Sequence, residues 1–276
     1  MPYSRRVAGL FVCLLLANAQ VASAQRIPSD SAEVEPAPVF TTRDAVYTGI
    51  AAGASIVIMQ YDERIFDYLA DSSLQGNEFL GDGADLIALL NEKSLFALGV
   101  VGYAVGKLAD APSLADIAFH ATEALIISSA VNTVLRGTLG RARPFISNGD
   151  DAFLFDPFSG FGDLGYRAFP SIHASAGFSV AAALTTETAY RNPEALWYVA
   201  PIAYAIGALP GIARVYNSKH WASDIPMGAV LGTLTGIRVV RYHHTRPGNW
   251  LDDIFLSTAI VPDGRGGVRV IISRTF

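Results

Sequence analysis

With 276 residues, the chain is long enough for one sizeable helical domain or two small ones. Apolar residues make up 51% of it, and its mean hydropathy of +0.33 is high for a soluble protein. The net charge of −5 argues against a nucleic-acid partner. The single cysteine, Cys13, lies in a segment that we expect to be removed, so the mature chain has no disulfide and no thiol chemistry.

Residues 1–24 have the pattern of a signal peptide. Arg5 and Arg6 precede an apolar stretch, and Ala22-Ser23-Ala24 offers a small-residue cleavage site. The apolar stretch is short for a membrane span, although an uncleaved anchor helix is the alternative. We therefore expect a protein of the bacterial cell envelope, either periplasmic or membrane-associated.

A helical domain is expected over residues 41–246, after a flexible, proline-containing lead-in over residues 25–40. Thr41 and Asp44 offer an N-cap, and Ser113 and Asp116 resemble a capping box that starts a long helix ending near Leu139. Runs without charged residues occupy 45–61, 94–106, 168–186, 196–213 and 225–237.

These uncharged runs leave two environments open. Three of them approach the length of about 20 residues that a bilayer span needs, and their many small residues suit close helix packing. The pattern favours a compact bundle in or on a membrane, with a soluble bundle of very apolar helices as the close alternative.

The C-terminal residues 250–276 have a different amino-acid composition. Residues 254–261 and 268–272 are rich in β-branched side chains, and a Pro-Asp-Gly-Arg-Gly-Gly segment separates them. This pattern predicts a terminal β-hairpin with a long loop.

One short segment, from Arg214 to Asp224, combines an arginine, a histidine and an aspartate. If His220 opens a helix, Asp224 lies one turn further along the same face. Its carboxylate can then hold the proton on one ring nitrogen and leave the other nitrogen free. Arg214 adds a fork of N–H donors suited to an oxyanion. A surface ion pair is the commoner meaning of such a spacing.

Arg136 and Arg143 lie seven residues apart, so both can face one point if the helix continues between them. Pro144 is expected to end the helix at Arg143. Two converging guanidinium groups are unfavourable without an anion between them. A basic helix end stabilised by the helix dipole is the alternative.

Another helix is expected to begin at Pro170, because proline is favoured at the first helical position. Ser171 and Ile172 would then offer a hydroxyl and free backbone N–H groups to an anion. His173 would lie at the rim of that site, able to protonate a leaving group. A buried histidine at the start of a core helix is the alternative.

Together these three stretches resemble the signature of the type-2 phosphatidic acid phosphatase and vanadium haloperoxidase superfamily, which includes bacterial acid phosphatases. That signature is Lys, six residues, Arg-Pro; then Pro-Ser-Gly-His; then Ser-Arg, five residues, His, three residues, Asp. Order and internal spacing match over residues 136–224. The departures are Arg136 for lysine, Ile172 for glycine, which could narrow the approach to the site, and Ala213 for serine.

The resemblance implies an all-α helical bundle and a phosphatase that works through a phosphohistidine without metal or other cofactor. It implies that His220 is the nucleophile, that Asp224 orients it, and that His173 protonates the leaving group and then activates water. The substrate would be a phosphomonoester or a pyrophosphate. The apolar helices favour a lipid phosphate, and membrane association is expected. The implied phosphate ligands are Arg136, Arg143, Ser171, the amide of Ile172, and Arg214.

Two further features lie outside the signature. The glycine-rich loop over residues 146–167 could cover the site or touch lipid tails, or its phenylalanines could fold onto the bundle. We interpret His120 as structural, and we expect His243 and His244 to face solvent. The loop's phenylalanines are Phe153, Phe155, Phe158 and Phe161.

Two other functions are compatible with the sequence. A vanadium haloperoxidase would use the same residues to hold vanadate, but such enzymes are usually much longer. A non-catalytic envelope protein could keep the pocket to bind an anion; the histidine pair argues against it and Ile172 weakly for it.

Overall fold

The computed structural model describes residues 36–246, 248–256, 258–262 and 268–272. The expected signal peptide and most of the expected lead-in lie outside these residues. The helices are α2 (Thr42–Met59), α3 (Asp62–Leu69), α4 (Ser72–Gln75), α5 (Glu78–Ala88), α6 (Glu92–Leu108), α7 (Pro112–Leu139), α8 (Ile172–Arg191), α9 (Leu196–Tyr216), α10 (Asp224–Thr245) and α11 (Trp250–Phe255). Three short 3-10 turns are η1 (Ser159–Phe161), η2 (Leu164–Tyr166) and η3 (Pro193–Ala195).

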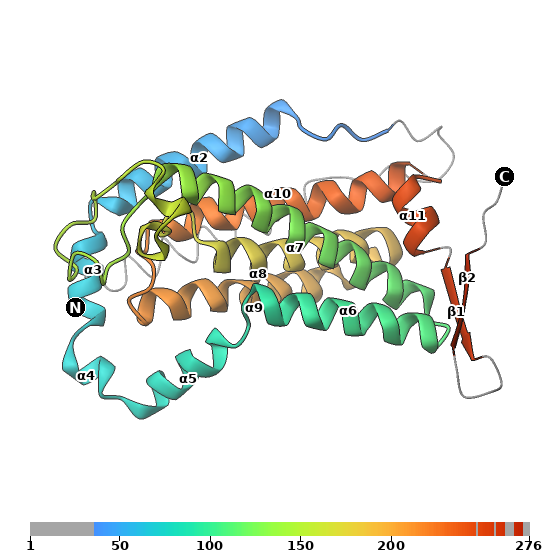
Figure 1. Cartoon of the computed structure of the whole chain (residues 1–276), viewed down its shortest axis with the longest axis horizontal. Coiled ribbons are helices and arrows are strands. Elements are labelled where there is room, and N and C mark those ends of the chain that lie inside the picture. The colour runs from blue at the N-terminus through green and yellow to red at the C-terminus, as the bar shows by residue number, and fades with distance from the viewer. Residues whose placement is uncertain (1–35, 247, 257, 263–267, 273–276) are drawn as a thin grey trace.

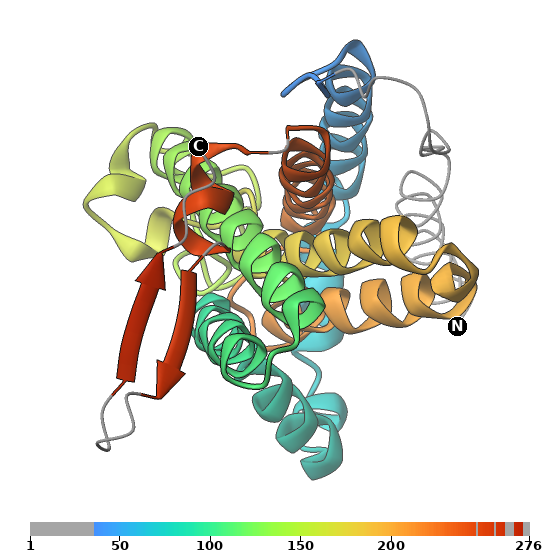
Figure 2. The same cartoon turned by 90° about the vertical axis from the view of Figure 1, so that its right-hand side faces the viewer.

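The long helices α6 to α10 run lengthwise in one bundle, so the expected helical fold is confirmed (Figure 1). Viewed along the bundle, α8 lies between α7, α9 and α10 (Figure 2), and it packs against all three. The main apolar core is formed by Phe178 on α8, Tyr204 on α9 and Ile237 on α10. Because α8 is surrounded, most of its side chains are buried.

Helix ends follow local capping chemistry, which the sequence predicted only in part. Thr41 is the expected N-cap of α2, and together with Asp44 it forms a capping box. The capping box expected at Ser113 is wrong, because Pro112 takes the first turn of α7 and Ala111 is its N-cap. The helix also stops before Pro144: Gly140 adopts a left-handed conformation with φ 59° and terminates α7 there.

The C-terminal segment begins with a helix. The Asn249 side chain accepts a hydrogen bond from the Asp252 N–H and starts α11, so the strand expected from Ile254 is wrong at its beginning. Strands β1 (Thr258–Pro262) and β2 (Val268–Ile272) pair antiparallel, with Thr258 opposite Ile272. The loop of the expected hairpin, residues 263–267, lies outside the described residues.

Much of the bundle's outer surface is apolar. Two described segments, Pro112–Leu139 and Pro193–Tyr216, are long and apolar enough to cross a membrane by length and composition. A groove also runs between α6, α7 and α11. It is lined by Phe96, Gly99, Val100, Tyr103, Phe119, Thr122, Glu123, Ile126, Leu251 and Phe255.

Three glycines spaced four residues apart let α10 lie directly against α8. A Cβ added at Gly228 would come within 2.3 Å of the Ser171 carbonyl oxygen. At Gly232 the same atom would meet the Ser175 oxygen at 2.2 Å, and Gly236 repeats the pattern one turn on. Backbone contact at this range tolerates no side chain, so these glycines set the distance between the two helices.

We expect Gly232→Ala to lower the free energy of unfolding by about 1–3 kcal/mol, because the new methyl group forces α8 and α10 apart. Gly53→Ala on α2 is the matched control, since nothing lies within 4 Å of the added Cβ. That change should be neutral or stabilising by up to about 1 kcal/mol. Denaturant titration of both variants in detergent measures the difference, and equal stabilities would contradict the helix contact.

Candidate functional site

The histidine pair and the aspartate expected from the sequence meet at the end of the bundle where α8 and α10 begin. His173 lies in the first turn of α8, His220 in the turn between α9 and α10, and Asp224 at the start of α10. The His173 Nδ1 atom is 3.4 Å from His220 Nε2, and His220 Nδ1 is 3.1 Å from Asp224 Oδ2. The carboxylate therefore orients one imidazole, and that imidazole presents its other nitrogen to the second.

Ser171 connects the start of α8 to the same carboxylate-bearing residue. Its hydroxyl accepts a hydrogen bond from the Ala174 N–H at 3.3 Å, and its own N–H donates to the Asp224 carbonyl at 3.0 Å. Ser171 is thus the N-cap, and the prediction that α8 begins at Pro170 is wrong. The backbone N–H groups of Ile172 and His173 have no hydrogen-bond partner among the described residues. The Ile172 side chain, which stands where the family signature has glycine, is buried.

Three arginines bring positive charge to the histidine pair. Arg136, Arg143 and Arg214 each have a buried Nε atom without a hydrogen-bond partner among the described residues. Arg143 and Arg214 both act electrostatically on His173 and on each other. Unpaired guanidinium groups that converge in a protein are unfavourable until an anion lies between them.

This environment favours the neutral form of both imidazoles. Burial, the neighbouring His220 and the arginines lower the pKa of His173 to about 2. Burial also lowers the pKa of His220, against the opposing effect of Asp224. Burial alone would raise the pKa of Asp224, but Arg141 and His220 hold it below its ordinary value. A neutral imidazole oriented by a carboxylate can act as a nucleophile.

Comparison with known proteins agrees with this geometry. Residues 118–247, which contain every one of these side chains, match the PAP2 superfamily. This region of the chain belongs to the PAP2 superfamily. The PAP2 region thus begins within α7 and ends just after α10.

One protein of similar sequence and one of similar fold were found. A lipid A 1-phosphatase from Porphyromonas gingivalis is 32% identical over 88 residues, which cover 32% of this chain and only 17% of that protein. A transmembrane PAP2 type phosphatidylglycerolphosphate phosphatase from Bacillus subtilis has a similar fold, with a TM-score of 0.54 and 20% identity. That match covers 72% of this chain and 94% of the other, and it supports an all-helical PAP2-type fold.

The PAP2 site contains a buried arginine that the sequence did not single out. Arg141 has no exposed surface, and it donates to Asp224 Oδ1 at 2.6 Å and to Asp62 Oδ2 at 2.8 Å. It also donates to the Ala152 carbonyl and to the Ser223 hydroxyl. Only its position two residues before Arg143 hinted at a role, because sequence cannot distinguish a buried arginine from an exposed one.

Two more charged groups near the site were missed. Glu92, at the start of α6, has Oε2 3.8 Å from His173 Nε2, and this oxygen is buried without a hydrogen-bond partner among the described residues. Arg167 acts electrostatically on Arg136 and Arg143 while its guanidinium donates to the Gly160 and Phe161 carbonyls. Neither residue belongs to the signature, so the motif comparison could not find them.

Metal-binding side chains gather elsewhere in the described part of the chain. Two groups of suitable spacing centre on His120, one with Glu187 and His244 and the other with His243 and Asp252. Both lie towards the end of the bundle opposite His173. The expectation that His243 faces solvent is wrong, since it is buried, and His244 is partly buried. Helix α11 and the end of α8 cover this region.

We expect Arg141→Met to destabilise the protein by about 3–5 kcal/mol, because Asp62 and Asp224 would remain buried without their cation. Arg64→Met, at an exposed position of α3, should change stability by less than about 0.5 kcal/mol. Denaturant titration compares the two. A small effect at Arg141 would mean that the two carboxylates do not depend on it.

Proposed function

We propose that the chain is a phosphatase that removes the phosphoryl group of a lipid phosphate through a phosphohistidine at His220. The observation that carries this proposal is the set of three arginine Nε atoms that have no hydrogen-bond partner among the described residues and lie around the His173–His220 pair. A phosphoryl group would be a negatively charged partner for these arginines, and its oxygens match the fork geometry of guanidinium.

In the first step the lone pair of His220 Nε2 attacks phosphorus. The P–N bond forms as the bond from phosphorus to the leaving oxygen breaks. Asp224 holds the proton on His220 Nδ1 and stabilises the positive charge that develops on the ring. Arg136, Arg143 and Arg214 would hold the phosphate oxygens, together with the Ser171 hydroxyl and the Ile172 N–H.

His173 has the role of acid and then base. Burial and the neighbouring positive charges lower the pKa of His173; the bound phosphate offsets the arginine charges, so the ring can take up a proton and give it to the leaving oxygen. In the second step the neutral His173 takes a proton from water, which attacks phosphorus as the P–N bond breaks. All proposed phosphate ligands are guanidinium, hydroxyl or amide groups, so we propose a reaction without a metal ion.

The apolar groove beside α6 supports a lipid substrate. Glu92 lies next to His173, and Phe96 follows one helical turn later on the same face of α6. From Phe96 the groove continues along α6 and α7 to α11. An acyl chain in this groove would leave its phosphate at the histidine pair, and the relative named for lipid A supports the same class of substrate.

The loop over residues 146–167 gives further support. Its four phenylalanines are 37–66% exposed, so none of them is buried in the bundle. Exposed aromatic side chains beside the site suit a membrane interface. We therefore propose that this end of the protein meets the lipid surface.

We expect His220→Ala to abolish turnover and covalent labelling, because it removes the attacking nitrogen. His173→Ala should slow turnover by about 10²–10⁴-fold, the usual contribution of a general acid. Rapid acid or base quenching with phosphorus-labelled substrate measures the phosphoenzyme, which should be stable in base and labile in acid. His244→Ala should label normally. A wild-type enzyme that turns over without such an intermediate would exclude the mechanism, and halide oxidation with vanadate would favour a haloperoxidase.

We expect the double variant Phe96→Ser and Val100→Ser to lose catalytic efficiency on phosphatidate far more than on a small aryl phosphate, because the lipid chain loses its apolar contacts. Leu98→Ser with Val101→Ser is the matched control: these residues lie on α6 outside the groove and are also exposed. The measured quantity is kcat/KM in mixed micelles. Equal losses in both double variants, or on both substrates, would argue against the groove as the lipid site.

A further inference from the structure

A second cluster of polar side chains lies where α7, α8, α10 and α11 meet, towards the end of the bundle opposite the phosphate site. It contains His120, Glu123, Glu187, His243 and Asp252. His120 and His243 are buried, and their rings stack with centroids 4.1 Å apart. Glu123 also lines the apolar groove, but the proposed phosphoryl transfer uses none of these side chains, so the cluster needs an explanation of its own.

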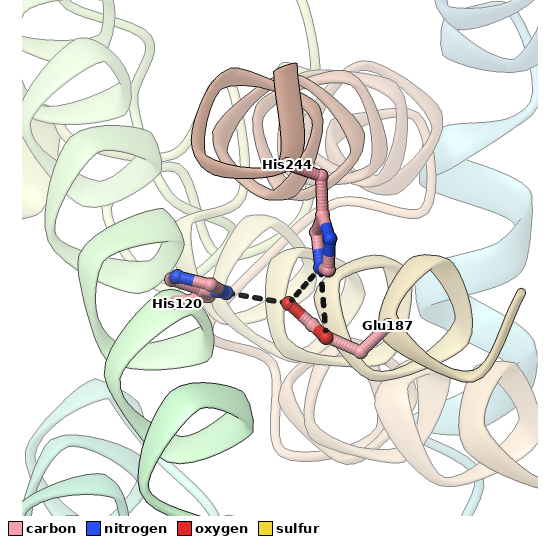
Figure 3. A group of neighbouring side chains, drawn as sticks. All are labelled: His120, Glu187 and His244. Carbon is pink, nitrogen blue, oxygen red and sulfur yellow. Dashed lines mark hydrogen bonds and ion pairs between the residues drawn. The ribbon is translucent and has the colours of Figure 1, made fainter. Parts of the chain in front are cut away.

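Each of the two stacked histidines has one ring nitrogen held by a carboxylate. His120 Nδ1 lies 2.5 Å from Glu187 Oε1, and His243 Nε2 lies 2.6 Å from Glu123 Oε2. Figure 3 shows Glu187 between His120 and His244, with the second nitrogen of His120 directed away from Glu187. A carboxylate on the outer nitrogen is the usual support of a metal-binding histidine, because it fixes the tautomer and turns the other lone pair inwards.

The inner nitrogens of the same rings face one carboxylate oxygen. His243 Nδ1 is 2.5 Å from Asp252 Oδ1, and His120 Nε2 is 3.9 Å from that oxygen. At 3.9 Å no hydrogen bond forms, and His120 Nε2 is a buried atom without a hydrogen-bond partner among the described residues. Two nitrogens and one oxygen therefore surround a single point, and one of the nitrogens is unsatisfied.

The carboxylates of the cluster also favour a bound cation. Glu187 is paired with Arg191 at 2.8 Å. Glu123 and Asp252 make no ion pair with a lysine or arginine among the described residues, and their partners are the histidines. Protonating both histidines would balance the two carboxylates but would place two like charges in stacked rings. A divalent ion supplies the same charge and also engages His120 Nε2.

We propose that His120 Nε2, His243 Nδ1 and Asp252 Oδ1 bind a divalent transition-metal ion of the zinc class. Two imidazoles and a carboxylate are a common zinc ligand set, with bond lengths of about 2.0–2.2 Å. Ligand atoms in such a set lie about 3.3 Å apart, between the two distances found here, so binding requires the Asp252 carboxylate to rotate and the two stacked rings to tilt towards the ion. The Asp252 side chain is 22% exposed on the short helix α11, which leaves room for that rotation and for a water as fourth ligand.

This site would fasten α11 to the bundle. Leu251 and Phe255 of α11 line the end of the apolar groove, and the Phe255 ring packs on Phe119 of α7. The ion would join α11 to α7 and α10 through one ligand from each helix. Because the ion would join three helices and lie at the end of the bundle opposite His220, its proposed role is to hold α11 in place, separate from the phosphoryl transfer.

The test uses the purified full-length chain in detergent, stripped with a chelator and then titrated with zinc chloride alone. We expect one zinc ion per chain, a rise in melting temperature with zinc, and slower amide exchange over residues 250–256. Asp252→Asn should weaken zinc binding at least about 100-fold, beyond the effect usual for an outer residue. Glu123→Gln keeps the three proposed ligands and alters the support of His243, so it should weaken zinc binding about 10–100-fold.

His244→Gln is the matched control, because His244 contacts Glu187 but is not one of the three proposed ligands. It should bind zinc as the wild type does. The proposal is overturned if the folded wild type binds no zinc, if Asp252→Asn binds it unchanged, or if His244→Gln loses it. None of these measurements depends on phosphatase activity, so their failure would leave the proposed reaction untouched.

Discussion

The end of the bundle that contains His173 and His220 depends on the buried carboxylate of Asp224. One oxygen accepts from the Trp221 N–H and holds His220, and the other accepts from Arg141. Its backbone carbonyl accepts from the N–H of Ser171. Three separate segments thus meet at one residue, and a buried anion is stable there only because each oxygen has a partner.

The two ends of the bundle have opposite excess charge. Around His173 and His220 there are more cations than anions, and three arginine Nε atoms have no hydrogen-bond partner in the part of the chain that the structure describes, which suits a substrate that brings negative charge. Around His120 and His243 carboxylates dominate, and His120 Nε2 has no hydrogen-bond partner in the same part of the chain, which suits a cation. Helix α8 contributes His173 to one end and Glu187 to the other, so a single buried helix separates the two environments.

The sequence predicted what depends on spacing and missed what depends on the folded chain. His173, His220 and Asp224 are identified by motif order, and they lie together as expected. Arg141 joins them through Asp62 of α3 and Asp224 of α10, and Glu92 of α6 joins them through His173 of α8; no local sequence pattern predicts these contacts. Likewise, His243 follows a basic helix end that resembles a surface, and only the packing of α11 buries it.

The close approach of α8 and α10 connects packing to chemistry. Gly228 of α10 lies against the Ser171 carbonyl. Gly228 is one helical turn from Asp224, and Ser171 comes two residues before His173. A side chain at this contact would move the N-termini of the two helices apart, and with them the hydrogen bond from Ser171 N–H to Asp224. The 3.4 Å distance between His173 and His220 is therefore a consequence of backbone packing between the helices. Since proton transfer requires side chains placed within a few tenths of an ångström, the glycines of α10 belong to the proposed mechanism as much as to the fold.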